Sequence, residues 1–91
     1  MLYAVNRAYG GFRLSEELAK ELGVRIYASY EFVRTDPRTF ASIRAGKERD
    51  LAIIDIPDEA TDWELNEYDG LEDVIAVVDG KLYHVPNIHE D

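Results

Sequence analysis

The chain contains no cysteine, and this absence excludes disulfide bonds, thiolate catalysis and thiolate metal sites. No apolar run approaches the roughly 20 residues that a helix needs to cross a bilayer. Residues 1–7 also lack the charged start and long apolar stretch of a secretory signal peptide. These absences predict a cytoplasmic protein.

Positive charge is scarce in the second half of the chain. Residues 1–49 carry nine Lys or Arg and six Asp or Glu, a net charge of +3, whereas residues 50–91 carry one Lys and thirteen Asp or Glu, a net charge of -12. Together they give the -9 of the whole chain, so broad binding of DNA or RNA is not expected. The acidic half is either a solvated face that keeps a small protein soluble or a surface for a basic protein partner.

Residues suited to catalysis or metal binding are few. The two histidines, His84 and His89, lie five residues apart and match no metal-ligand spacing. Ser15 has no histidine near it in the sequence to act as its base, and abundant carboxylates do not by themselves identify an acid–base pair. The sequence therefore predicts no catalytic residue, no metal and no cofactor, and it favours a binding protein over an enzyme.

Length and apolar patterning predict one small domain. Ninety-one residues suffice for one core but not for two. Apolar patterns predict strands over residues 2–5, 24–32, 51–56, 74–78 and 82–85, and the strict alternation makes 24–32 the clearest of them. Capping signals predict two helices, one from Ser15 to Gly23 and one from Asp36-Pro37 to Gly46.

Two glycine turns, Asp69-Gly70 and Asp79-Gly80, predict a meander of strands near the C-terminus. Residues 62–68 fit either a strand or a short helical turn. The expected fold class is α+β, with a mixed or mostly antiparallel sheet and two helices packed on one face. We expect the domain to span residues 1–85 and residues 86–91 to form a loose tail.

The glycine loop, residues 9–15, lies between an expected strand and an expected helix, where backbone N–H groups and a positive helix end can meet an anion. The rings of Tyr9 and Phe12 can stack on the base of a nucleotide. The Arg13 guanidinium, the Ser15 hydroxyl and the backbone N–H groups can form hydrogen bonds to its phosphate. The other interpretation is that the rings are core anchors and the glycines only make a tight turn. The loop matches neither a phosphate-loop signature nor a dinucleotide fingerprint. Its candidate ligand-binding residues are Tyr9, Gly10, Gly11, Phe12, Arg13 and Ser15.

Residues further along the chain can complete this site. Arg34 and Arg38 flank the second helix start and add cations if the fold brings the two helix starts together. Asp36 joins that site, pairs with Arg34 or caps the second helix. Tyr68 and Asp69 either form only a hairpin turn or line the same pocket, where Asp69 would orient an arginine or accept a ribose hydroxyl.

Four blocks of this sequence, residues 9–15, 34–37, 54–58 and 68–72, together resemble a group of short uncharacterised proteins from phages, large DNA viruses and bacteria. The shared pattern is YGGF-S, R-DP, IP-D and YDG-E, and the resemblance extends to about Val78. The chain departs from the pattern at Arg13, where relatives commonly have serine, and near its end, where many have a basic and aromatic segment. The resemblance implies an intact domain and a phage setting, in which such proteins are suspected of acting against host defence.

Two binding functions are compatible with these features, and a small nucleotide-processing enzyme is the third. The first is a phage-type protein that sequesters a small anionic nucleotide signal in the host cytoplasm. The second is an acidic inhibitor that covers a basic, nucleic-acid-binding surface of a host protein. An open strand edge can support a homo-oligomer in either case. The partner-binding residues of the second hypothesis are Asp62, Glu64, Glu67, Glu72 and Asp73.

Overall fold

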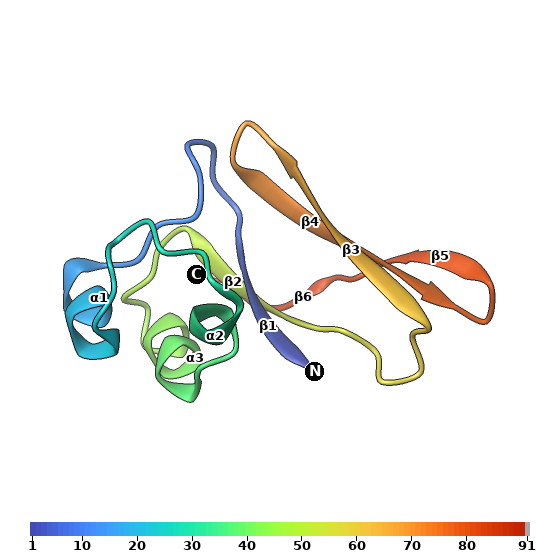
Figure 1. Cartoon of the computed structure of the whole chain (residues 1–91), viewed down its shortest axis with the longest axis horizontal. Helices are drawn as coiled ribbons and strands as arrows, with labels where there is room; N and C mark the ends of the chain where they lie inside the picture. Colours follow the sequence, from blue (N-terminus) through green and yellow to red (C-terminus); the bar gives the residue numbers. More distant parts are fainter. Residues whose placement is uncertain (91) are drawn as a thin grey trace.

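Two antiparallel three-stranded sheets and three helices make up residues 1–90, the part of the chain that this computed structural model describes (Figure 1). One sheet has the order β1-β2-β6 and the other β3-β4-β5. The predicted α+β class is confirmed, with the strands divided between two sheets and one more helix than expected. The strands are β1 (Leu2–Asn6), β2 (Leu51–Asp55), β3 (Asp62–Tyr68), β4 (Leu71–Val78), β5 (Lys81–His84) and β6 (Asn87–Glu90), and the helices are α1 (Glu16–Leu22), α2 (Glu31–Arg34) and α3 (Pro37–Arg44).

β2 lies at the centre of the fold because it is apolar on both faces. Ile53 packs in the cluster that the helices cover, and Ile54 packs on the opposite face of the same sheet. On that opposite face, Val74 and Ala76 of β4 join the core. The molecule is therefore layered, with helices on one face of the β1-β2-β6 sheet and the second sheet on the other. This arrangement confirms the strand predicted within residues 51–56, whose nearly continuous apolar run suits a strand covered on both faces.

The two glycine turns form tight hairpins, as predicted. Asp69 and Gly70 have φ angles of 51° and 89°, and Asp79 and Gly80 have φ angles of 53° and 74°. Positive φ at both central residues is the mark of a type I′ turn, whose twist matches that of the flanking strands. The first turn joins β3 to β4, so the ambiguous residues 62–68 form a strand.

The strand predicted over residues 24–32 is wrong. Residues 24–30 run as an irregular segment, and residues 31–34 form the short helix α2. Val24 and Ile26 pack against the core that the helices cover and Ala28 is buried in it, whereas Tyr30 and Phe32, which complete the alternation, are exposed. A period of two indicates which side chains face inward, but it does not provide a neighbouring strand to pair with. The backbone of residues 24–30 is instead held to the glycine loop by a hydrogen bond of 2.7 Å from Leu14 N to Ile26 O.

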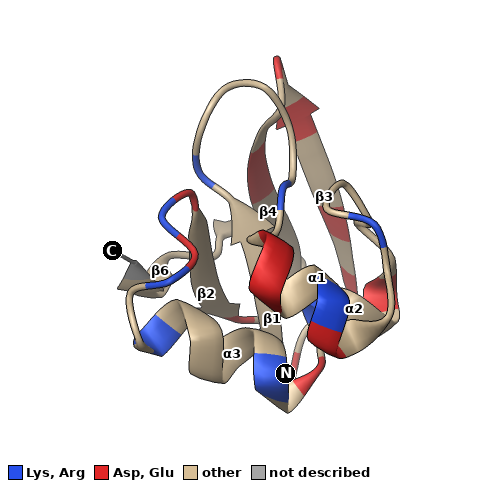
Figure 2. Ribbon diagram, turned by 90° about the vertical axis from the view of Figure 1, so that its left-hand side faces the viewer, with Lys and Arg blue, Asp and Glu red and all other residues tan. Residues whose placement is uncertain are grey.

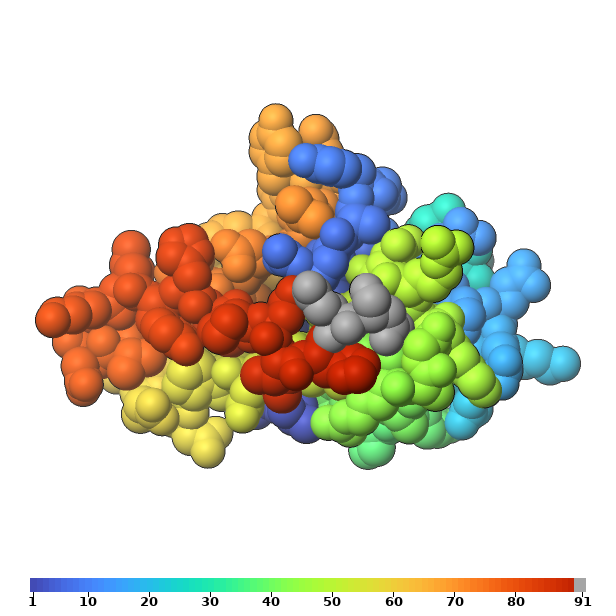
Figure 3. All heavy atoms as spheres, turned by 180° about the vertical axis from the view of Figure 1, so that it is seen from behind, coloured from blue at the N-terminus to red at the C-terminus, as the bar shows by residue number. Residues whose placement is uncertain are grey.

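The loose tail predicted over residues 86–91 is also wrong for the described residues 87–90, and Asp91 lies outside them. Asn87–Glu90 forms β6, which pairs with β2 and carries an irregularity opposite Ile53 and Ile54. Without β6, the central strand would leave one edge open. β6 also lies against α3, as the view from behind shows (Figure 3). The tail carries too little apolar alternation for its sequence to show this pairing.

Both predicted helices form with their expected caps. The Ser15 hydroxyl accepts a hydrogen bond from Leu18 N at the start of α1, and Gly23 ends that helix with a φ angle of 72°. Asp36 caps α3, with Pro37 in its first turn. In the part of the chain that the structure describes, no helix is long and apolar enough to span a membrane.

Candidate functional site

The glycine loop lies directly against the turn between β3 and β4 (Figure 1). Gly10 N donates a hydrogen bond of 2.9 Å to the carbonyl oxygen of Asp69. The backbones approach so closely that a β-carbon on Gly70 would lie 2.1 Å from Gly11 N. Two of the predicted blocks, far apart in the sequence, therefore meet.

Arg34, a predicted ligand-binding residue, is the buried centre of this junction. Its Nη1 and Nη2 donate to the two carboxylate oxygens of Glu72 at 2.8 and 2.6 Å. Its guanidinium lies 4.3 Å from the Phe12 ring centroid, and its Nε donates to the Ser29 carbonyl at 2.9 Å. Since Arg34 is only 3% exposed and its charge is balanced by Glu72, the structure gives it an internal partner.

Glu72 does not belong to the exposed acidic surface on which the sequence placed it. It is 6% exposed, because the alternation of β4 turns it to the same face as Val74 and Ala76. One carboxylate oxygen also accepts a hydrogen bond of 2.7 Å from Asn6 N, and its carbonyl accepts one from Arg7 Nη1. Glu72 thus joins β1, α2 and β4 rather than facing a partner.

The start of α1 already holds an anion, and the protein itself supplies it. Ser15 N and Ser15 Oγ donate to the two carboxylate oxygens of Glu48 at 2.7 and 2.6 Å, and Ser42 Oγ donates at 2.6 Å. Glu48 is 3% exposed. The geometry therefore does not support a phosphate on Ser15. The sequence hid Glu48 because it stands between Lys47 and Arg49, in what looks like a solvated run of charges.

Asp36 and Arg38 lie at the start of α3 and pair with each other. Arg38 donates to the Asp36 carboxylate from Nε at 3.1 Å and from Nη2 at 3.0 Å. These side-chain bonds, with a backbone bond from Arg38 N, lower the pKa of Asp36. Arg38 also reaches the Glu21 carbonyl at the end of α1, and it lines a hollow between α1 and α3 rather than the glycine loop. The fold does not bring this pair to the other candidate residues.

Replacing Asp36 with alanine should destabilise the protein by about 1 kcal/mol at pH 7, the usual effect of losing a helix cap. Because the folded pKa of Asp36 is lowered, its stabilisation is present above the unfolded value of 3.8 and is lost as pH falls through the folded value. Thermal unfolding of wild type and Asp36→Ala should therefore differ at pH 7, and the difference should shrink as the pH falls below 3.8 and through the lowered pKa of the folded state. A constant difference between the two proteins would contradict this role.

A groove of about 470 Å³ lies between the glycine loop, the segment 24–30 and the β3–β4 hairpin. The buried Phe12 ring and the Arg34–Glu72 pair form its bottom, so its deepest charges cancel. A second hollow, of about 520 Å³, adjoins the same 24–30 segment and includes Arg25. The first groove is lined by Gly11, Phe12, Tyr27, Ser29, Arg34, Leu65, Glu67, Gly70 and Glu72.

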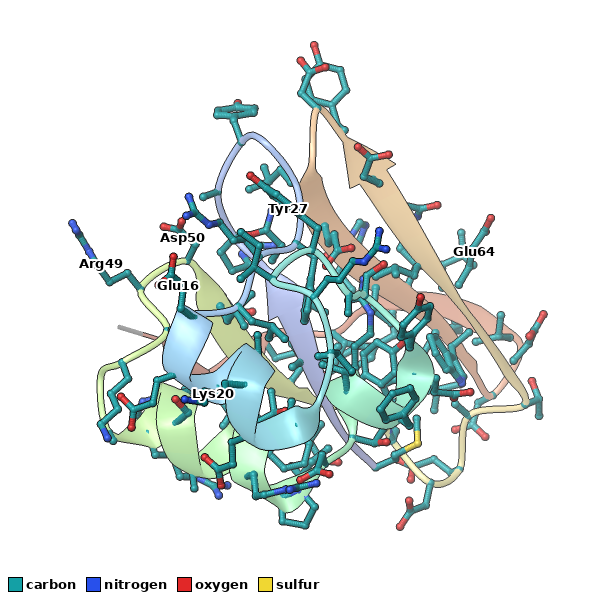
Figure 4. The ribbon with its side chains drawn as sticks, turned by 60° about the vertical axis from the view of Figure 1, so that its left-hand side comes forward. Glu16, Lys20, Tyr27, Arg49, Asp50 and Glu64 are labelled. Carbon is teal, nitrogen blue, oxygen red and sulfur yellow. The ribbon has the colours of Figure 1, made fainter. Side chains whose placement is uncertain are left out.

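Tyr27 lines both hollows and is 62% exposed. Figure 4 shows its side chain between the glycine loop and the β3–β4 hairpin. The Arg13 guanidinium lies 5.9 Å from the Tyr27 ring centroid. Among the side chains that the structure describes, no carboxylate forms an ion pair with Arg13 or Arg25. The sequence did not identify Tyr27, Ser29 or Arg25, because the alternation assigned them to a strand.

Tyr9 and Tyr68 are both 71% exposed and stand near the tips of the two touching loops. Tyr68 lines a separate hollow of about 370 Å³ together with Arg7 and Asp73, and Tyr27 is not among the residues that line it. Tyr68 therefore does not share the groove that holds Phe12. Asp69 contributes its carbonyl to the glycine loop, and the turn around it has the structural role that the sequence offered as one alternative.

The remaining candidate acidic residues lie on the β3-β4-β5 sheet, and Figure 2 shows Asp and Glu along it. Asp62, Glu64 and Glu67 are exposed on β3. Asp73 is half-buried and lies 3.2 Å from His84 Nδ1. Over residues 1–90, no group of three or more His, Asp or Glu side chains is placed to hold a metal ion.

Comparisons with protein-family models, curated proteins and solved structures find no match to this chain. The resemblance to the short phage and viral proteins accordingly stays a prediction. A fold class alone does not specify an activity, so the chemistry of the groove and its surroundings must indicate the function.

Proposed function

We propose that the chain is a non-catalytic binding protein that holds a small anionic ligand of the nucleotide class in the groove beside Tyr27. The observation that carries this proposal is the Arg13 guanidinium 5.9 Å from the ring centroid of the exposed Tyr27, a residue that lines a groove of about 470 Å³. That volume lies within the usual range of roughly 300–1,000 Å³ for small-molecule sites.

Each part of the ligand has a matching group at the groove. The Tyr27 ring offers a stacking surface for a base, and the guanidinium of Arg13, with that of Arg25 in the adjoining hollow, offers charge-assisted hydrogen bonds to phosphate. Ser29 adds a hydroxyl to the lining of both hollows. Because Arg34 and Ser15 already have carboxylate partners, phosphate recognition falls to the arginines at the rim.

The biological setting is part of the same proposal. The resemblance to phage proteins favours a nucleotide signal of host defence as the ligand. A protein that binds such a signal stoichiometrically lowers its free concentration and so prevents it from reaching its receptor. No chemical step is required for that effect.

Arg13→Ala should weaken nucleotide binding by roughly 10- to 100-fold, since a hydrogen bond to a charged group contributes about 1.5–3 kcal/mol. Tyr27→Ala should weaken it as well, through lost stacking. Isothermal titration calorimetry with mononucleotides, dinucleotides and cyclic oligonucleotides would measure both effects. Arg44→Ala is the matched control, because Arg44 is an exposed arginine on α3 that lines neither hollow and has no ion pair among the side chains that the structure describes.

Two outcomes would overturn the proposal. If no nucleotide in the panel binds, or if Arg44→Ala weakens binding as much as Arg13→Ala, the groove is not the site. Conversion of a bound nucleotide to product by the purified protein would exclude a purely binding role.

A further inference from the structure

The outer face of the β3-β4-β5 sheet is a second surface, distinct from the groove. The inner face carries Val74 and Ala76 into the core. Alternation therefore turns the intervening side chains outward, and pairing across the strands sets them in rows. Asp62, Val77 and Leu82 form one row, and Glu64, Ile75 and His84 form the next.

This outer face has an apolar centre that no described element covers. Leu82 is 76% exposed, and Ile75 and Val77 are only half-buried. The side chains by which this sheet joins the core cluster, Val74 and Ala76 with Trp63, Leu65 and Val78, alternate with those of the outer face. A contiguous group of aliphatic side chains that remain partly or fully accessible on a solvent-facing sheet is typical of an interaction surface.

Carboxylates flank that apolar centre on one side. Asp62 and Glu64 stand on β3, which pairs only with β4 and so forms the edge of its sheet. β3 carries no Lys or Arg, and within residues 1–90 neither carboxylate forms an ion pair. In Figure 4, Glu64 points away from the body of the molecule.

This charge selects the occupant of the face. A second copy would bring like charges together along β3, which is how natural edge strands resist pairing with themselves. Nucleic acid and anionic lipid surfaces would be repelled for the same reason. A cationic protein surface would be attracted, and its apolar residues could cover the exposed aliphatic centre.

We propose that the outer face of the β3-β4-β5 sheet binds a basic amphipathic segment of a partner protein. An apolar stripe of that segment covers Ile75, Val77 and Leu82, and Lys or Arg beside the stripe pair with Asp62 and Glu64. This site does not depend on the groove, so a ligand and a partner can bind together.

The probe for this surface is a fluorescein-labelled amphipathic peptide of about 18 residues, with a leucine stripe and a lysine stripe, in fluorescence anisotropy titrations at a series of salt concentrations. Two further peptides replace its lysines with glutamate or its leucines with serine. Glu64→Lys should weaken binding of the Leu/Lys peptide by roughly tenfold, whereas Glu16→Lys should change it by less than about twofold. Glu16 is the matched control because it is exposed on α1, on the far side of the molecule from Glu64, and its reversal changes net charge equally (Figure 4).

Binding should be absent for the glutamate peptide and strongly reduced for the serine peptide, and Leu82→Ser should weaken the Leu/Lys peptide without altering circular dichroism. If Glu64→Lys and Glu16→Lys lose affinity for the Leu/Lys peptide equally, the effect comes from net charge alone and the proposal is overturned. A dimer in native mass spectrometry that Leu82→Ser dissociates would assign the face to a second copy instead. Unchanged affinity across the salt series would also overturn it, because attraction between exposed charges is screened.

Discussion

Replacing Arg34 with alanine is expected to lower the free energy of unfolding by about 3–5 kcal/mol, the usual effect of removing one partner from a buried ion pair. Arg34 and Glu72 are 3% and 6% exposed, so the Glu72 charge would stay buried without its main partner. The carbonyls of Ala4 and Ser29 would also lose a donor each. The whole free energy of unfolding of a small domain is only about 5–15 kcal/mol, so the Arg34→Ala variant should be close to unfolding.

Urea unfolding followed by circular dichroism measures this effect. The control is Lys47→Ala, which removes the exposed ion pair with Glu17 at 3.4 Å and should change stability by less than about 1 kcal/mol. The double variant Arg34→Met with Glu72→Met should recover part of the loss, because it leaves no buried charge unpaired. A loss in Arg34→Ala no larger than that in Lys47→Ala would show that water reaches the pair in solution.

The local signals of the sequence predicted the elements whose causes are themselves local. Ser15 and Asp36 cap helices through backbone groups two or three residues away, and Asp69-Gly70 makes its turn from its own φ angles. Such features need no information from the rest of the chain. They were confirmed for this reason.

The elements that the sequence misassigned depend on distant partners. Residues 24–30 have inward-facing side chains at alternate positions, but both positions beside the apolar strand β2 are taken by β1 and β6. β6 is a strand because one edge of β2 is available to pair with it. β2 lies about 35 residues earlier in the chain, so the local sequence of β6 does not show this pairing. Propensity cannot decide either case, since the outcome is a competition among segments for one edge.

The candidate site shows the same division between local features, which the sequence predicted, and pairings of distant residues, which it did not. The sequence identified the loop, the arginine and the hairpin turn that meet at the groove, but it did not indicate which charges cancel. Arg34 and Glu72 are 38 residues apart, and Ser15 and Glu48 are 33 apart. Those pairings leave Arg13 and Arg25 as cations at the hollows, and no local pattern distinguishes them from the arginine that is buried.

Gly70→Ala is expected to be the most destabilising glycine substitution in the loops around the groove. Its φ angle of 89° lies in a region that costs a residue with a β-carbon about 1–2 kcal/mol. The new β-carbon would also lie 2.1 Å from Gly11 N and 2.8 Å from the carbonyl carbon of Gly10. Overpacking typically adds about 1–3 kcal/mol, so a total of about 2–5 kcal/mol is expected.

The variant Gly80→Ala separates the conformational penalty from the overpacking penalty. Gly80 occupies the same position in the second hairpin, with a φ angle of 74°, but a β-carbon there would meet no atom within 4 Å. It should therefore show only the conformational penalty of about 1–2 kcal/mol in urea unfolding. Equal losses in the two variants would mean that the glycine loop moves away from the hairpin without resistance. Since that contact holds one wall of the groove in place, a larger loss in Gly70→Ala would show that the groove is built on a rigid junction before any ligand arrives.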